Sequence, residues 1–122
     1  MKNIEKTMEL MANGMTISKA LAEVYKTRKI KIVLEDECLN TSIYKAKLNN
    51  RALHCFERLK IETLGQVVDY LNENDWNTIK NFGEGTAVDT LEKILDVAWS
   101  KLETVERAEF LLRVDMHNEA KE

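Results

Sequence analysis

Proline is absent from this 122-residue chain, and glycine occurs only four times. Proline breaks helices and glycine supplies turns, so their scarcity excludes a loop-rich or collagen-like chain and favours a helical one. Hydrophobic residues make up 44% and charged residues 32% of the chain, a balance that separates it from disordered proteins. Its length suits one compact domain, or a small domain with a helical attachment.

Cysteine and long apolar runs are also scarce. Cys38 and Cys55 form neither a disulfide framework nor a zinc-ligand spacing, so free thiols are expected. The longest apolar run lies within residues 30–34 and is interrupted by Lys31, far short of a membrane span. The N-terminal residues MKNIEKTMEL contain no secretory hydrophobic region, which predicts a cytoplasmic protein without a membrane partner.

The two signs of charge are unevenly distributed. Residues 1–60 carry 12 basic and 7 acidic side chains, whereas residues 61–122 carry 6 basic and 14 acidic ones. This asymmetry can offer a basic surface to an anionic partner and an acidic surface to another protein. It is equally compatible with ordinary solubility.

The first residues predict a pair of helices. Apolar residues from Ile4 to Met11 recur at helical spacing until Asn13, and Gly14 is a natural helix stop. Thr16 can cap the second helix. The outline is that of a helix-turn-helix, although most such pairs are simply packing units.

A basic cluster follows the helical pair. Ile30 and Ile32 alternate with lysines, which favours a short strand or an extended arm over a helix. These basic side chains could neutralise nucleic-acid phosphates, or they could form the solvated face of an edge strand. The cluster consists of Lys26, Arg28, Lys29 and Lys31. Residues 40–47 are interpreted as a linker into the main module.

The main module is predicted to begin at Leu48 and to contain several short helices. Asn49 is a good N-cap for a helix whose apolar face leaves Arg51 solvent-accessible near its start. Thr63 begins a capping-box pattern for the next helix. Thr86 is predicted to cap the long helix that follows.

Helical spacing extends into the C-terminal part of the sequence. Apolar residues from Val88 to Val105 alternate spacings of three and four, which predicts one long helix. This helix could form a homodimer or pack against the N-terminal pair, and packing within the chain is favoured because the N-terminal apolar stripes need a partner. Trp99 lies off the main stripe and is the candidate for an exposed contact.

Residues 79–87, IKNFGEGTA, match the turn of a helix-hairpin-helix. In such a turn, backbone N–H groups and the N-terminus of the next helix face outward together, an arrangement that suits a phosphate. Phe82 would anchor the turn, while Gly83 and Gly85 permit positive φ angles and close approach. A plain structural joint between two helices is the alternative.

From Leu48 to about Leu95 the chain resembles the C-terminal domain of the bacterial RNA polymerase alpha subunit. The resemblance is carried by LNNRALHCFERLKI, TLGQVV and IKNFGEGT. Domains of that family grip the DNA minor groove and bind activators and sigma factor. The resemblance implies that Arg51 enters the minor groove, a contact favoured in A-T-rich DNA. His54 falls where the family often has asparagine, and the turn residues implied to contact DNA are Asn81, Gly83, Gly85 and Thr86.

The sequence also departs from the family pattern. Where the family commonly has lysine after the NFG sequence, this protein has Glu84 and then Gly85. The loss of a phosphate-binding cation should weaken DNA binding and flatten its salt dependence. Nothing resembles the large assembly domain of the alpha subunit, so a free-standing module of bacterial or phage origin is expected.

Catalytic and metal-binding constellations are not apparent in the sequence. His54 and Cys55 are neighbours on a helix, where side chains point about 100° apart, so they do not form a nucleophile–base pair. The cysteines and histidines show no recognised metal-ligand spacing. We therefore expect no enzymatic activity, no cofactor and no metal.

These observations predict an all-α protein in three parts. Residues 1–47 form a helical pair and a short extended arm, residues 48–101 a helix-hairpin-helix core, and residues 102–122 a C-terminal helical tail. The predicted function is that of a small transcription-associated protein that binds double-stranded DNA. The rival is a protein-interaction module that docks on RNA polymerase, sigma factor or a regulator without binding DNA, a hypothesis that Glu84 and the acidic half favour.

Overall fold

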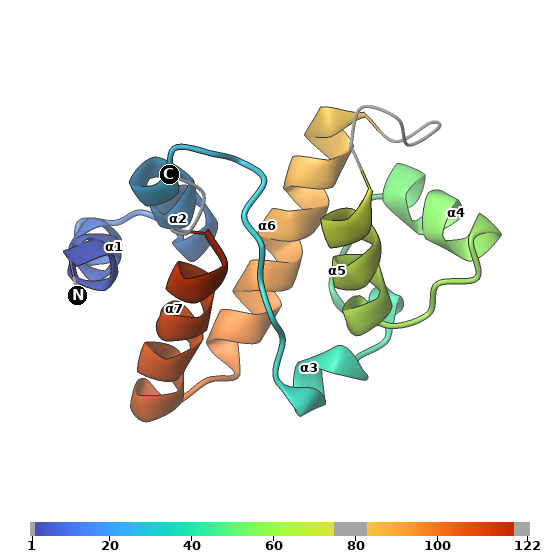
Figure 1. Ribbon diagram of the computed structural model, residues 1–122. Helices are drawn as coiled ribbons and strands as arrows, with labels where there is room; N and C mark the ends of the chain where they lie inside the picture. The colour runs from blue at the N-terminus through green and yellow to red at the C-terminus, as the bar shows by residue number, and fades with distance from the viewer. Residues whose placement is uncertain (1, 75–82, 119–122) are drawn as a thin grey trace.

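The structure is a computed structural model that describes residues 2–74 and 83–118 (Figure 1). The described residues contain no strand and only one isolated β-bridge, between Ser42 and Thr63, so the predicted all-α class is confirmed. The helices are α1 (Lys2–Ala12), α2 (Ile17–Tyr25), α3 (Asp36–Leu39), the 3-10 helix η1 (Ile43–Lys45), α4 (Asn50–Arg58), α5 (Leu64–Glu73), α6 (Glu84–Ser100) and α7 (Thr104–Asn118).

Polar caps define where three of these helices begin, as the sequence predicts. Thr16 caps α2, and Asn49 caps α4 by accepting a hydrogen bond from the backbone N–H of Ala52. At α5, the Thr63 hydroxyl accepts from the N–H of Gln66 while the Gln66 side chain accepts from the N–H of Thr63, which completes the capping box. Each cap satisfies an N–H group that has no partner within its helix.

The prediction that Thr86 caps the long helix is wrong. α6 begins at Glu84, and Gly83 occupies the N-cap position without any side-chain hydrogen bond. Glycine is tolerated at an N-cap because it adopts the required extended backbone freely. Thr86 therefore lies within the first turn, where its carbonyl accepts a 2.7 Å hydrogen bond from the Thr90 hydroxyl.

Residues 30–34 form the extended arm, which crosses in front of α6 (Figure 1). The arm does not pair as a strand: Asn118 of α7 holds it by accepting from the backbone N–H of Lys31 at 3.0 Å and donating to the carbonyl of Lys31 at 2.8 Å. The alternation in the sequence separates side chains that pack inward from those that face out. The inward set is Ile30, Ile32 and Leu34.

The interpretation of residues 40–47 as a linker is wrong, because this segment packs tightly against α5. The side chain of Ile43 is buried, and its N–H donates to the carbonyl of Glu62 at 3.0 Å. In return, the N–H of Leu64 donates to the carbonyl of Thr41 at 2.9 Å. The segment therefore belongs to the packed core of the module.

The predicted single C-terminal helix is divided in two. α6 ends at Ser100, and α7 turns back to pack against α1 (Figure 1). The expected packing within the chain is thus confirmed, whereas Val105, predicted to continue the apolar stripe, is 70% exposed. The buried apolar residues of α7 are Phe110, Leu111 and Val114.

Trp99 makes its contacts within the protein, contrary to the prediction of an exposed contact. Its ring meets the ring of Phe110 edge to face, with centroids 6.1 Å apart. The guanidinium of Arg107 lies 4.8 Å from the ring centroid of Trp99, within the range of a cation–π interaction.

Among the described residues, no helix combines the length and apolarity needed to cross a membrane.

Candidate nucleic-acid interface

The first turn of α4 presents Arg51 to solvent. Ala52, Cys55 and Phe56 form the buried face of this helix, and Arg51 lies at the edge of that face, where its side chain is exposed. Within the described part of the protein, the guanidinium has no hydrogen-bond or ion-pair partner. His54 is also exposed and lies three residues further on, hence on the same side of the helix.

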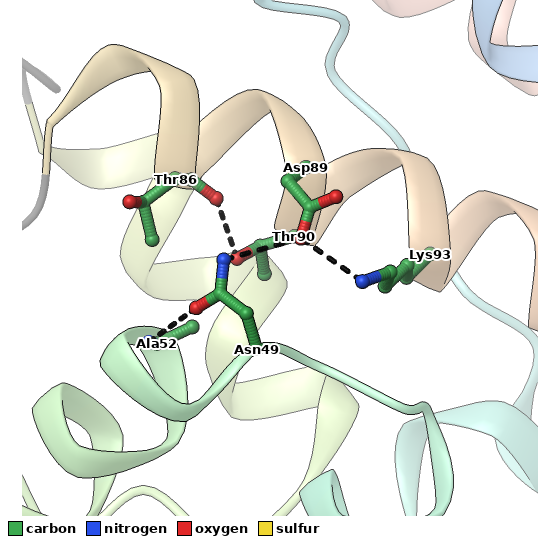
Figure 2. A network of polar contacts seen from close by, with 6 residues as sticks. All are labelled: Asn49, Ala52, Thr86, Asp89, Thr90 and Lys93. Atoms are coloured by element: carbon green, nitrogen blue, oxygen red, sulfur yellow. Dashed lines mark hydrogen bonds and ion pairs between the residues drawn. The ribbon is translucent and has the colours of Figure 1, made fainter.

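One asparagine ties this turn to the start of α6, as Figure 2 shows. The Asn49 carbonyl oxygen accepts the capping bond from Ala52 at 2.8 Å, and its amide nitrogen donates to the Asp89 carboxylate at 3.3 Å. Asp89 also accepts a 3.2 Å hydrogen bond from the Lys93 ammonium. Because one side chain makes both bonds, the first turn of α4 is held beside the early turns of α6.

The start of α6 is open to solvent. Gly83, Glu84 and Gly85 are exposed, and a Cβ atom added at either glycine would meet nothing within 4 Å. The first N–H groups of a helix have no intrahelical acceptor and carry the positive end of the helix dipole. Gly83 has an ordinary φ of −70°, so the positive φ predicted for it is wrong. What Gly83 contributes to this site is that it leaves the start of α6 accessible.

Two carboxylates limit the positive character of this surface. Glu84 lies exposed in the first turn of α6, where it is favourable for the helix dipole but would repel a phosphate. Asp89 lies one turn further along, and its charge is compensated by Lys93. The site therefore offers one free guanidinium and a helix N-terminus, with the carboxylate of Glu84 as the opposing charge.

Comparison with known protein families gives a match over much of the sequence. Residues 30–103 match the model of the C-terminal domain of the bacterial RNA polymerase alpha chain, and this range is more than half of the sequence. The protein belongs to this family. The resemblance predicted for residues 48–95 is confirmed and extends to the arm and to the end of α6. Comparisons with curated proteins and with solved structures give no match.

In this member of the alpha C-terminal domain family, the predicted site residues fall into two groups. Arg51, His54, Gly83, Gly85 and Thr86 lie on the two adjoining helix starts. Asn81 and the Phe82 anchor lie outside the described residues, as does the hairpin turn itself.

The basic cluster lies on the other side of α6. α4 packs on one side of this helix and α2 on the other (Figure 1). Lys26 and Arg28 line the groove between α2 and α6. Lys26 adopts a left-handed conformation at the end of α2 and forms a 3.9 Å ion pair with Glu23. Lys29 is exposed, while Lys31 is half-buried. The cluster is therefore separated from Arg51 by the width of α6.

Sequence reasoning missed the contact that joins the two helix starts. The pattern predicts Asn49 as a cap, but its second bond, to Asp89, joins residues 40 positions apart. No local pattern signals such a pair. Across the described residues, no group of three or more metal-ligating side chains comes together.

Proposed function

We propose that this alpha C-terminal domain relative binds double-stranded DNA, with Arg51 in the minor groove and the first amides of α6 on an adjacent phosphate. The observation that carries the proposal is that Arg51 is exposed and unpartnered in the first turn of α4, which Asn49 links to Asp89 near the open start of α6. Family membership supplies the transcription-related context. Under this proposal the protein acts in the cytoplasm and has no enzymatic activity.

Each part of the surface has a physical role in this proposal. A guanidinium is attracted into the narrow minor groove of A-T tracts, where the negative potential is deepest. A helix N-terminus binds a phosphate through free N–H groups and its dipole, and exposed glycines at Gly83 and Gly85 allow the backbone to approach. His54 and Thr86 would add polar contacts at the edge, and Asn81 would extend them along the turn.

The expected affinity is modest, because few phosphates are contacted. Each neutralised phosphate contributes about 0.9 to the slope of log affinity against log salt. Glu84 subtracts from this attraction, so a shallow slope is expected. The basic cluster at Lys26, Arg28, Lys29 and Lys31 would contribute only where the duplex also reaches the α2 side of α6.

Arg51→Ala tests the proposal directly. Wild type and variant are titrated into a fluorescently labelled A-T-rich duplex and a G-C-rich duplex at several salt concentrations. Loss of an inserted arginine should weaken binding to the A-T-rich duplex by about tenfold or more and reduce the preference for it.

Glu84→Lys should act in the opposite direction, with tighter binding of the duplex and a steeper dependence of affinity on salt.

Arg58→Ala is the matched control for this experiment. Arg58 is also exposed and belongs to the last turn of the same helix, so its removal changes the net charge equally at the far end of α4. The control should bind nearly as wild type. Equal losses for the two arginine variants would mean that only net charge matters, and the proposed insertion would be wrong.

The second candidate function is a protein-interaction module that docks on RNA polymerase, sigma factor or a regulator. The exposed carboxylate of Glu84, at the position where a phosphate would bind, favours it. Under this hypothesis neither wild type nor Arg51→Ala binds either duplex, while immobilised RNA polymerase retains both proteins. A homodimer through the C-terminal helix is not part of either candidate: Phe110, Leu111 and Val114 of α7 are buried within the protein, and only Val105 and Met116 would offer large apolar side chains to a second copy.

A further inference from the structure

An open groove of about 590 Å³ lies between α2 and α6, away from the surface proposed for DNA. Its volume falls in the range of ordinary ligand and peptide sites. The apolar side chains that line it come from both helices, the arm and the turn before α2: Met15, Ala22, Ile30, Val88, Leu91 and Leu95.

The groove depends on a part of the protein that lies outside the family match. α2 precedes residue 30, where the match begins, and it provides one wall; α6 provides the other. A module consisting of the matched residues alone would expose this face of α6. The N-terminal helices therefore convert it into a groove with two walls.

Positive charge borders the groove on the α2 side. Lys19, Lys26 and Arg28 line it and are exposed. Lys26 is compensated by Glu23 at 3.9 Å, but the side chains of Lys19 and Arg28 have no hydrogen-bond or ion-pair partner within the described residues. Glu92 is the acidic side chain on the α6 wall.

We propose that this groove binds an acidic amphipathic segment of a partner protein. Apolar side chains of the segment enter the groove, and its carboxylates pair with Lys19 and Arg28. A helix that lays its apolar face into a groove is a common mode of peptide recognition. Charge at the rim favours an acidic partner over a basic one and steers the encounter.

The apolar lining distinguishes a protein segment from DNA as the occupant. Phosphates would engage the cations at the rim but would leave the accessible parts of Met15, Ala22 and Val88 in contact with water. A peptide with leucine side chains removes this apolar surface from water, a gain of about 25 cal/mol per Å². The groove and the Arg51 surface are therefore two separate sites, and the inference does not depend on DNA binding.

The test uses the 122-residue chain and three synthetic helix-forming peptides. The first has leucines along one face and glutamates beside them, the second replaces each glutamate by lysine, and the third has the composition of the first with its leucines scattered around the helix. Binding is followed by fluorescence anisotropy of labelled peptides. The first peptide should bind at least about tenfold more tightly than either of the others.

Variants of the protein locate the site. The double charge reversal Lys19→Glu with Arg28→Glu should weaken binding of the first peptide at least tenfold, and Ala22→Gln, which narrows the groove, should weaken it severalfold. Arg58→Glu is the control for charge, and Arg51→Ala is the control for the DNA surface. Both controls should bind the peptide as wild type does, and circular dichroism should show that all variants remain helical.

Amide chemical shifts complete the test. The first peptide should shift the signals of Lys19, Ala22, Val88 and Glu92. The inference is overturned if the acidic and basic peptides bind equally, if none binds, or if the shifts fall elsewhere. It is also overturned if DNA, rather than the peptide, is the occupant of the groove. In that case a DNA duplex would shift these groove signals, and the double charge reversal would abolish duplex binding but leave peptide binding intact.

Discussion

Gly65 lies where the start of α5 closely approaches the end of α3. A Cβ atom added there would lie 2.8 Å from Cδ2 and 3.0 Å from the carbonyl oxygen of Leu39, at the end of α3. The carbonyl cannot move without shifting α3. We predict that Gly65→Ala lowers the free energy of unfolding by about 1–3 kcal/mol, measured by urea denaturation, because the overpacking outweighs the helix propensity gained.

Gly85→Ala is the matched control for this prediction. Gly85 also lies in the first turn of a helix, but the position of an added Cβ is free of contacts within 4 Å. Alanine should therefore leave stability unchanged or raise it by up to about 1 kcal/mol. A loss at Gly85 as large as that at Gly65 would show that glycine's backbone, rather than the contact with Leu39, is responsible.

Cys38 gives a prediction about pH. Burial raises the pKa of its thiol, and nearby Lys101 only partly opposes the shift. The unfolded protein therefore loses the thiol proton at lower pH than the folded one, so the contribution to stability is complete below the unfolded pKa and is lost as pH rises through the folded pKa. Between about pH 7 and pH 10, wild type should lose more free energy of unfolding than Cys38→Ala in urea titrations. Parallel losses in the two proteins would contradict this.

Single residues can be predicted from the sequence where their environment is local. Arg51 is correctly expected on the exposed side of its helix, because the apolar spacing of α4 fixes the buried face. The bond between Asn49 and Asp89, and the approach of Gly65 to Leu39, join distant segments. Both depend on how helices meet, and helix periodicity does not specify that.

At the scale of an element, the two threonines near helix starts differ in role. Thr63 caps α5 through its hydroxyl, whereas Thr86 lies inside the first turn of α6 and makes no cap. We predict that Thr63→Ala costs about 1 kcal/mol in free energy of unfolding, within a range of roughly 0.5–2. Thr86→Ala should cost less, since no capping bond is lost. Denaturant unfolding of both variants measures the difference, and a larger cost at Thr86 would place the start of α6 after residue 86.

Helix starts are more predictable than helix ends. Three caps are predicted correctly because a cap is a bond between residues three positions apart. The end of α6 at Ser100 is missed, because the apolar spacing continues through Leu102 to Val105. Leu102 is buried and Val105 is exposed, so the backbone turns between them. The packing of α7, which the apolar spacing does not specify, determines this turn.

At the scale of the whole molecule, the N-terminal and C-terminal helices are joined by polar bonds. The Asp115 carboxylate of α7 accepts hydrogen bonds from Tyr25 of α2 at 2.6 Å and from Asn3 of α1 at 3.1 Å. Through these bonds α7 supports α2, which forms one wall of the groove beside α6. Because α2 also packs directly against α6, the N-terminal helices contact the family module as well as α7.

Asn118 of α7 also holds the arm, residues 30–34. Its substitution tests how α7 fixes the position of the arm. Its side chain bonds both backbone groups of Lys31, at 3.0 and 2.8 Å, and no strand supplies alternative partners for them among the described residues. Asn118→Ala leaves two half-buried backbone groups unsatisfied, so the free energy of unfolding should fall by about 1–3 kcal/mol. Hydrogen exchange at the Lys31 amide should also accelerate. His117→Ala, at the exposed neighbouring position, should change neither quantity. If exchange at Lys31 accelerates equally in both variants, general fraying of α7 would account for it, and the specific hold on the arm would be wrong.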